Sequence, residues 1–129
     1  MKSNRIVLIA TILIGIALFF QLRLASGGID PIQAQNMTKQ GVLLVDVRDQ
    51  DEFASIHVPN AKLIPLPDLG SRLKEIEEYK NKPILVMCHS GIRSSKAVSQ
   101  LKDAGFTQAI SVSGGIVAWE KAGLEVVHK

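Results

Sequence analysis

Cysteine is nearly absent from this sequence, because the chain of 129 residues holds only Cys88. One cysteine excludes an internal disulfide, a Cys-x-x-Cys redox pair and a zinc site built from several thiolates. The three histidines, His57, His89 and His128, lie too far apart along the chain for metal-ligand spacing. We therefore predict that the protein binds no metal and uses no cofactor.

Aromatic residues and charge of one sign are also scarce. The chain has one Trp and one Tyr, and its 15 Lys and Arg residues are dispersed among 12 Asp and Glu residues, for a formal net charge of +3. Proteins that bind nucleic acids present a basic face with interleaved aromatic side chains. Nucleic acid is therefore not an expected partner.

One long hydrophobic run stands apart from the rest of the chain. Residues 6–20, IVLIATILIGIALFF, carry no charge. As a helix this run would rise only about 22 Å, against roughly 30 Å for the hydrocarbon core of a bilayer. Continuing to Leu24 gives about 28 Å, with Arg23 able to reach the interface. We therefore predict one N-terminal hydrophobic helix within residues 1–27 that acts as a single-pass membrane anchor.

The same segment also fits a secretory signal peptide. The short basic start, MKSNR, precedes the run, and residues 25–27, Ala-Ser-Gly, form a candidate cleavage site of small residues. Lys2 and Arg5 before the run, against Arg23 after it, favour by one charge a cytoplasmic N-terminus, which would export the following domain. The anchor is favoured over the cleaved signal peptide, and both stay open.

Residues 28–129 are long enough for one domain with its own core. Apolar runs predict four short buried strands, at residues 42–45, 61–65, 84–87 and 109–112. Helices are predicted around and between them, at residues 31–40, 49–55, 68–79, 95–104 and 116–121. Short strands that alternate with helices indicate an α/β fold with a mainly parallel sheet.

Cys88 directly follows the apolar run at residues 84–87, at the end of a predicted strand. Ligands of open α/β sheets bind beyond the carboxyl ends of the strands. A loop that curls at Gly91 ahead of a helix can aim several backbone N–H groups at one point. A thiol there should have a lowered pKa, and Arg93 would add a fixed positive charge. Cys88 is thus a candidate nucleophile, although free cysteines are more often inert core residues.

The segment Cys88-x-x-Gly91-x-Arg93-Ser94 resembles the active-site loop of the rhodanese family of sulfurtransferases. The similarity extends over most of residues 30–129. Its other elements, in chain order, are Asp46-Val47-Arg48, Glu52-Phe53, His57 with Ala61, and Gly114-Gly115 through Ala118-Trp119. Each element is weak alone, but their common order makes the resemblance specific.

The resemblance implies a compact rhodanese-like domain over residues 28–129, with about five strands in a mainly parallel sheet between helices. It implies a sulfurtransferase in which Cys88 takes a sulfane sulfur from thiosulfate or a persulfide and passes it to a thiol or cyanide. The implied partners are therefore a small sulfur donor and a thiol acceptor, on a small molecule or a protein. The residues implied as the cradle around the sulfur are His89, Ser90, Gly91, Ile92 and Arg93, with Asp46, Arg48 and Ser94 as supporting residues.

Loop length separates sulfur transfer from a neighbouring chemistry. Phosphatases and arsenate reductases with a similar loop place five residues between Cys and Arg, whereas this chain places four between Cys88 and Arg93. A tighter ring suits one sulfur atom better than a phosphate. A non-catalytic binding module with the same fold stays a further alternative, although the intact Cys88 argues against it. Because His89 and Ser90 bring no fixed positive charge, we do not expect the dianion thiosulfate to be the preferred donor.

Overall fold

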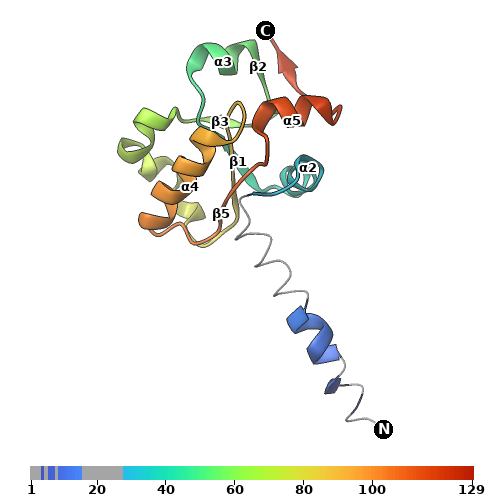
Figure 1. Cartoon of the computed structure of the whole chain (residues 1–129). Helices are drawn as coiled ribbons and strands as arrows, with labels where there is room; N and C mark the ends of the chain where they lie inside the picture. Colours follow the sequence, from blue (N-terminus) through green and yellow to red (C-terminus); the bar gives the residue numbers. More distant parts are fainter. Residues whose placement is uncertain (1–3, 5, 8, 16–27) are drawn as a thin grey trace.

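The computed structural model describes residues 4, 6–7, 9–15 and 28–129 (Figure 1). Over residues 28–129 the chain alternates strands with helices. The helices are α2 (Pro31–Lys39), α3 (Gln50–Ser55), α4 (Ile92–Asp103) and α5 (Gly115–Lys121), with two 3₁₀ helices, η1 (Leu66–Ser71) and η2 (Leu73–Tyr79). The strands are β1 (Leu43–Asp46), β2 (Ile56–His57), β3 (Lys62–Leu63), β4 (Ile84–Met87), β5 (Ala109–Ser111) and β6 (Val127–His128).

Four parallel strands form the central sheet, in the order β3-β1-β4-β5. The two middle strands, β1 and β4, pair along their full length, from Leu43 opposite Ile84 to Asp46 opposite Met87. All four strands therefore end at one edge of the sheet, where Cys88 follows β4. The predicted α/β class, the parallel sheet and the four strands expected from the apolar runs are confirmed, whereas the count of about five strands that the family resemblance implied is one too high.

A single residue occupies the place of the missing strand. Ile29 forms an isolated parallel bridge with Val112, beside β5, and its N–H donates to the Ser111 carbonyl at 2.8 Å. Directly after it, Asp30 caps α2 and Pro31 takes the first helical position. Because a helix begins at the next residue, this edge strand cannot lengthen in that direction.

Helices cover both faces of the sheet. Side chains alternate along a strand, so neighbouring residues of β4 enter different layers. Val86 packs in a buried cluster with side chains of α4, η1 and η2, whereas Leu85 packs in a second cluster with α2 and α5. Figure 1 shows α4 on one side of the sheet and α2 with α5 on the other. Cys88 belongs to the α4 layer, together with Val86.

Two local features differ from the sequence prediction. The single helix expected at residues 68–79 is two 3₁₀ helices that meet at Arg72, in a stretch where Pro67 and Gly70 lower the α-helix propensity. In addition, β2 and β6 form a small antiparallel sheet that was not predicted. Strands of two residues are too short to show a hydrophobic period, so the sequence offers no signal for this pairing.

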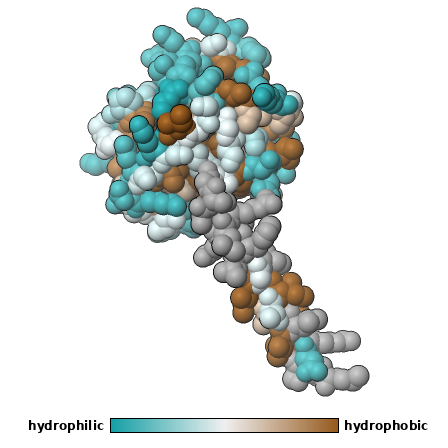
Figure 2. All heavy atoms as spheres, in the orientation of Figure 1, coloured by the Kyte–Doolittle hydropathy of each residue, from teal (hydrophilic) through white to brown (hydrophobic). Residues whose placement is uncertain are grey.

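The N-terminal residues that the structure describes are helical and exposed. Ile12, Leu13 and Ile14 are each more than half exposed, and Figure 2 shows apolar side chains gathered along this helix. In the described part of the chain, no helix combines the length and the apolar character needed to cross a membrane. Most of residues 1–27, the expected anchor or signal segment, lies outside the described residues, so that expectation stays a prediction.

Candidate active site

Cys88 lies at the carboxyl edge of the sheet, as the first residue after β4, between the ends of β1 and β5. Its side chain is buried, with 1% exposed. The Gly91 N–H donates to Cys88 Sγ at 3.0 Å, and Ser94 Oγ lies in hydrogen-bond contact with the same sulfur at 3.4 Å. Gly91 has a φ of +114°, which permits the tight curl that turns the loop back over the sulfur.

The loop changes the acidity of the thiol. Burial raises the pKa of Cys88, but hydrogen bonds from the Ser94 hydroxyl and from the backbone N–H groups of Ser94, Gly91 and Ser90 outweigh it. The pKa of Cys88 is therefore lowered from its ordinary value. The thiolate is the nucleophilic form of cysteine, so these contacts favour a reactive sulfur rather than an inert core residue.

Ser94 joins the loop to the neighbouring strand. It is fully buried, and its hydroxyl donates to the Gly91 carbonyl at 3.1 Å and lies 2.6 Å from Ser111 Oγ, at the end of β5. Ser111 was not among the predicted site residues. It is the last residue of a short apolar strand, and only the parallel pairing of β5 with β4 shows that it reaches the loop.

The start of α5 packs directly on the loop. The Ile116 N–H donates to the Cys88 carbonyl at 2.9 Å, and the Val117 N–H donates to the His89 carbonyl at 3.2 Å. Gly115, at φ +60°, makes this approach possible, because a Cβ there would lie 2.4 Å from the His89 oxygen and 2.5 Å from the Cys88 oxygen. The glycine pair that resembles a family motif therefore fixes the position of the loop backbone.

The guanidinium group of Arg93, expected to add a positive charge near Cys88, pairs with a carboxylate of α3. Its two terminal nitrogens donate to the two carboxylate oxygens of Glu52, at 2.7 and 2.9 Å. The pair is partly buried, and the hydrogen bond from Arg93 is the main reason that the pKa of Glu52 is lowered to about 2. Arg93 is thus held by α3, 41 residues earlier in the chain, and both ends of its guanidinium fork are occupied.

Asp46 and Arg48 form a buried ion pair beneath α3. The Arg48 side chain donates to Asp46 Oδ2 at 2.8 Å, to the Ile56 carbonyl at 2.7 Å and to the Glu52 carbonyl at 3.4 Å. These groups lie at the end of β1 and along α3, not in the Cys88 loop. Asp46 and Arg48 therefore hold α3, the helix that carries Glu52, and their support of the loop stays a prediction.

The other loop side chains lie on the surface. His89 and Ser90 are exposed, and Ile92 is 70% exposed. Arg93 carries the only formal charge of residues 88–94. Among the described residues, no group of three or more His, Cys, Asp or Glu side chains is placed to hold a metal ion.

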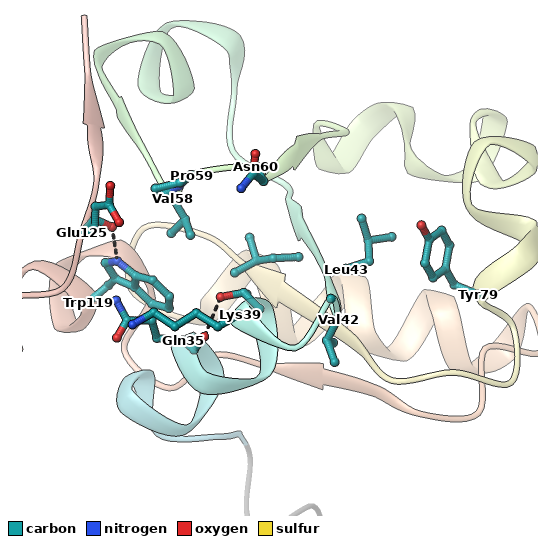
Figure 3. A pocket seen from close by; sticks show the side chains of 13 residues that line it. Gln35, Lys39, Val42, Leu43, Val58, Pro59, Asn60, Tyr79, Trp119 and Glu125 are labelled. Carbon is teal, nitrogen blue, oxygen red and sulfur yellow. Dashed lines mark hydrogen bonds between the residues drawn. The ribbon is translucent and has the colours of Figure 1, made fainter.

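A separate hollow of about 360 Å³ lies near the start of β1 (Figure 3). Lys39 of α2, Asn60 of the turn before β3, and Trp119 of α5 are among the side chains around it. None of its lining residues belongs to the Cys88 loop. Because strands β1 and β4 run parallel, this hollow lies toward the opposite edge of the sheet from the thiol.

Comparison with known proteins gives consistent matches over the domain. The family model described as "Rhodanese-like domain" matches residues 30–122. The chain is 36% identical over 91 residues to the thiosulfate sulfurtransferase GlpE of Pseudomonas syringae pv. syringae, covering 70% of this chain and 84% of that protein. It is 35% identical over 88 residues to a sulfurtransferase of Allochromatium vinosum, covering 68% of this chain and 80% of that protein.

Solved structures show the same fold. A rhodanese-related protein from Thermoplasma volcanium matches with a TM-score of 0.71 at 29% identity, covering 79% of this chain and 98% of that chain. The BH2092 protein from Bacillus halodurans matches with a TM-score of 0.72 at 25% identity, covering 88% of this chain and 85% of that chain. Both matches cover most of each chain, so the similarity concerns the whole domain rather than the loop alone.

Proposed function

This chain belongs to the rhodanese-like domain family, and from that premise we propose that it is a sulfurtransferase that carries one sulfane sulfur as a persulfide on Cys88. The observation that carries the proposal is the way in which the sulfur is held. Cys88 Sγ accepts the Gly91 N–H at 3.0 Å and contacts Ser94 Oγ at 3.4 Å. Both contacts favour the thiolate, which is the form that attacks another sulfur.

The proposed reaction consists of two displacements at sulfur. In the first, the Cys88 thiolate attacks the outer sulfur of the donor and a new S–S bond forms. The donor's own S–S bond breaks, and its electron pair leaves with a thiolate or, when the donor is thiosulfate, with sulfite. In the second, an acceptor thiolate or cyanide attacks the outer sulfur of the persulfide, and the Cys88 thiolate leaves. The electrons balance within each step.

The loop backbone supports this chemistry by stabilising negative charge on sulfur. The Gly91 N–H donates to Cys88 Sγ, and the backbone N–H groups of Ser90 and Ser94 also lower the pKa of Cys88. Helix α4 begins at Ile92 with its positive end in the loop. Donors that are already oriented cost no reorganisation when charge develops on the sulfur. The same groups are available to the thiolate before transfer and to the persulfide after it.

The two alternative functions have weaker support. A phosphatase or arsenate reductase needs donors around a tetrahedral oxyanion, but the loop places only four residues between Cys88 and Arg93, and Glu52 occupies the Arg93 fork. A non-catalytic binding module would not need the hydrogen bonds that converge on the sulfur. Turnover of an aryl phosphate would revive the first alternative. Equal function of the wild type and Cys88→Ala in cells would revive the second.

Mass spectrometry tests the proposed function directly. The full chain, kept in mild detergent, is incubated with thiosulfate or with cysteine persulfide and then digested. We expect the peptide that contains Cys88 to gain the mass of one sulfur atom and to lose it again on treatment with cyanide. Cys88→Ser, which is nearly isosteric, should stay folded and gain no sulfur. A folded wild type that takes sulfur from neither donor would contradict the proposal.

We also propose, from the sequence alone, that residues 1–27 attach the domain to a membrane. The support is the uncharged run at residues 6–20 and the basic residues on each side of it. The charge difference across the run favours an exported domain. A cleaved signal peptide is the alternative, and both place the sulfur chemistry outside the cytoplasm when the N-terminus is cytoplasmic.

A further inference from the structure

Arg93, five residues after Cys88, belongs to an ion pair that is fixed from several sides. Glu52 accepts both terminal nitrogens of Arg93. Its backbone N–H donates to Asp49 Oδ1 at 2.8 Å, and its side chain accepts the Asp49 N–H at 3.4 Å, which forms a capping box at the start of α3. The buried Arg48 also donates to the Glu52 carbonyl. The carboxylate is therefore preorganised to hold Arg93.

The pairing removes the positive charge that the loop would otherwise present. Arg93 is the only charged residue of the loop, and it lies within electrostatic reach of both Cys88 and Asp49, since both raise the pKa of Arg93 after the larger effect of the Glu52 hydrogen bond. The pair has no net charge. With Asp49 and the Cys88 thiolate, the net charge of this region is negative, and it should repel an approaching anion.

The net negative charge near Cys88 should affect the two classes of sulfur donor differently. Thiosulfate arrives as a dianion and leaves as sulfite, also doubly charged, so a cation near the sulfur stabilises its transition state more than that of a less charged donor. A low-molecular-weight thiol persulfide brings at most one negative charge on the reacting sulfurs and leaves a single thiolate. Backbone N–H groups alone can stabilise that smaller charge.

We propose that Glu52 is a specificity-determining residue which, by holding Arg93, makes the Cys88 site select thiol persulfides over thiosulfate. The proposal rests on the proposed sulfur transfer and deepens it by naming the donor class. Glu52 acts through Arg93 and does not touch the sulfur, so it is a positioning residue. Releasing Arg93 from Glu52 should make the loop cationic and admit the dianion.

The substitution Glu52→Gln tests this inference, because it removes the charge and keeps the shape. Loading of Cys88 is followed by mass spectrometry in the full chain, in mild detergent, with thiosulfate and with cysteine persulfide as donors. We expect kcat/KM for thiosulfate to rise roughly 10- to 100-fold. This is the gain expected when the released Arg93 donates one charged hydrogen bond to thiosulfate. We expect kcat/KM for the persulfide to change by less than about threefold.

Two control variants separate charge from structure. Glu75→Gln breaks a similar forked pair with Arg72, on η2, and should leave the ratio of the two donors unchanged. Adding Arg93→Gln to Glu52→Gln should abolish the gain with thiosulfate, because the released charge is then absent. A gain that persists without Arg93 would overturn the proposed route of action.

The dependence of the loading rate on ionic strength is a second measurement. It should not differ between the wild type and Glu52→Gln if Glu52 has a purely structural role. In the wild type, salt should speed loading from thiosulfate, because it screens a repulsion, whereas in Glu52→Gln it should slow loading, because it screens an attraction. If Glu52→Gln fails to fold, the salt dependence of thiosulfate loading in the wild type is the deciding measurement. A wild-type loading rate that falls as salt is added overturns the inference. Loading by both donors with an unchanged ratio in folded Glu52→Gln overturns only this inference. Loading by neither donor in the wild type overturns it together with the proposed function.

Discussion

At the scale of single residues, the Ser94 hydroxyl has three hydrogen-bond partners but only one proton to donate. Its oxygen lies within hydrogen-bond distance of Cys88 Sγ, the Gly91 carbonyl and Ser111 Oγ. A hydroxyl has one proton to donate. When Ser111 donates to Ser94 Oγ, the proton of Ser94 can turn from the Gly91 carbonyl to Cys88 Sγ. The hydroxyl can therefore follow the charge as Cys88 ionises.

The substitution Ser94→Ala should raise the pKa of Cys88, because it removes a hydrogen bond that lowers it while burial still acts. The rate of alkylation by iodoacetamide follows the thiolate fraction, so its midpoint on the pH axis should move upward. Loss of a partner for the buried Ser111 should also cost about 1–3 kcal/mol of stability. Ser95→Ala is the matched control, since Ser95 also donates to the Gly91 carbonyl, at 2.8 Å, but is exposed. Equal midpoints for the two variants would contradict this role.

The Glu52–Arg93 pair should make stability depend on acid. The hydrogen bond from Arg93 lowers the pKa of Glu52 from 4.5 to about 2, against burial, which raises it. Between these two values the unfolded chain binds more protons, so the free energy of unfolding should fall as the pH falls through this window. Above pH 4.5 the contribution is complete.

Urea unfolding at several pH values measures this contribution. Glu52→Gln should be less stable than the wild type at pH 7, and the two free energies of unfolding should converge as the pH approaches 2. Glu77→Gln, an exposed position on η2, serves as the control and should follow the wild type. Curves for Glu52→Gln and the wild type that stay parallel down to pH 2 would contradict the lowered pKa of Glu52 in the folded state.

At the scale of elements, the contact between α5 and the Cys88 loop depends on Gly115. An added Cβ would lie 2.4 Å from the His89 oxygen, and the residue has a φ of +60°. Gly115→Ala should therefore cost about 1–2 kcal/mol for the backbone conformation and about 1–3 kcal/mol more for the clash, with loss of sulfur transfer. Urea unfolding and the loading assay measure both effects.

Gly123→Ala separates the two costs. Gly123 has a similar φ of +72°, but a Cβ there would meet nothing within 4 Å. This variant should lose only the conformational part, about 1–2 kcal/mol, and should keep its activity. If both variants lose the same stability and both stay active, the close contact between α5 and the loop is not required.

The buried pair of Arg48 and Asp46 ties α3 to the end of β1. Arg48→Ala would leave the Asp46 carboxylate buried without its partner, so we expect a loss of about 3–5 kcal/mol in urea unfolding. Arg72→Ala, which breaks a half-exposed pair, should cost no more than about 1 kcal/mol. If Arg48→Ala also cost no more than about 1 kcal/mol, other contacts would be holding α3.

At the scale of the whole molecule, residues 1–27 are proposed to be a membrane anchor, with a cleaved signal peptide as the alternative. Washing membranes with carbonate, after expression of the full chain, separates the two predictions. An anchor should keep a full-length chain in the membrane pellet, whereas a signal peptide should release a chain shortened at about residue 27. A full-length chain in the wash would contradict both.

Much of the domain could be predicted because its signals are local. Apolar runs of four residues mark β1 and β4, Asp30 and Pro31 mark the start of α2, and Gly91 marks the curl of the loop. These features depend on neighbouring residues and on backbone geometry, so they can be read along the chain. The Ile29 bridge beside β5 and the β2–β6 pairing were not predicted, because segments of one or two residues show no hydrophobic period.

The sequence by itself determined the α/β fold, the position of Cys88 after a buried strand and the length of its loop, since each follows from residue order. Only the tertiary structure decided what the loop touches. It brought Glu52 to Arg93 across 41 residues and Ser111 to Ser94 across 17, and it set α5 on the Cys88 carbonyl. Parallel strands end at one edge of the sheet, so residues distant in the chain meet there, and that meeting sets the charge around the sulfur.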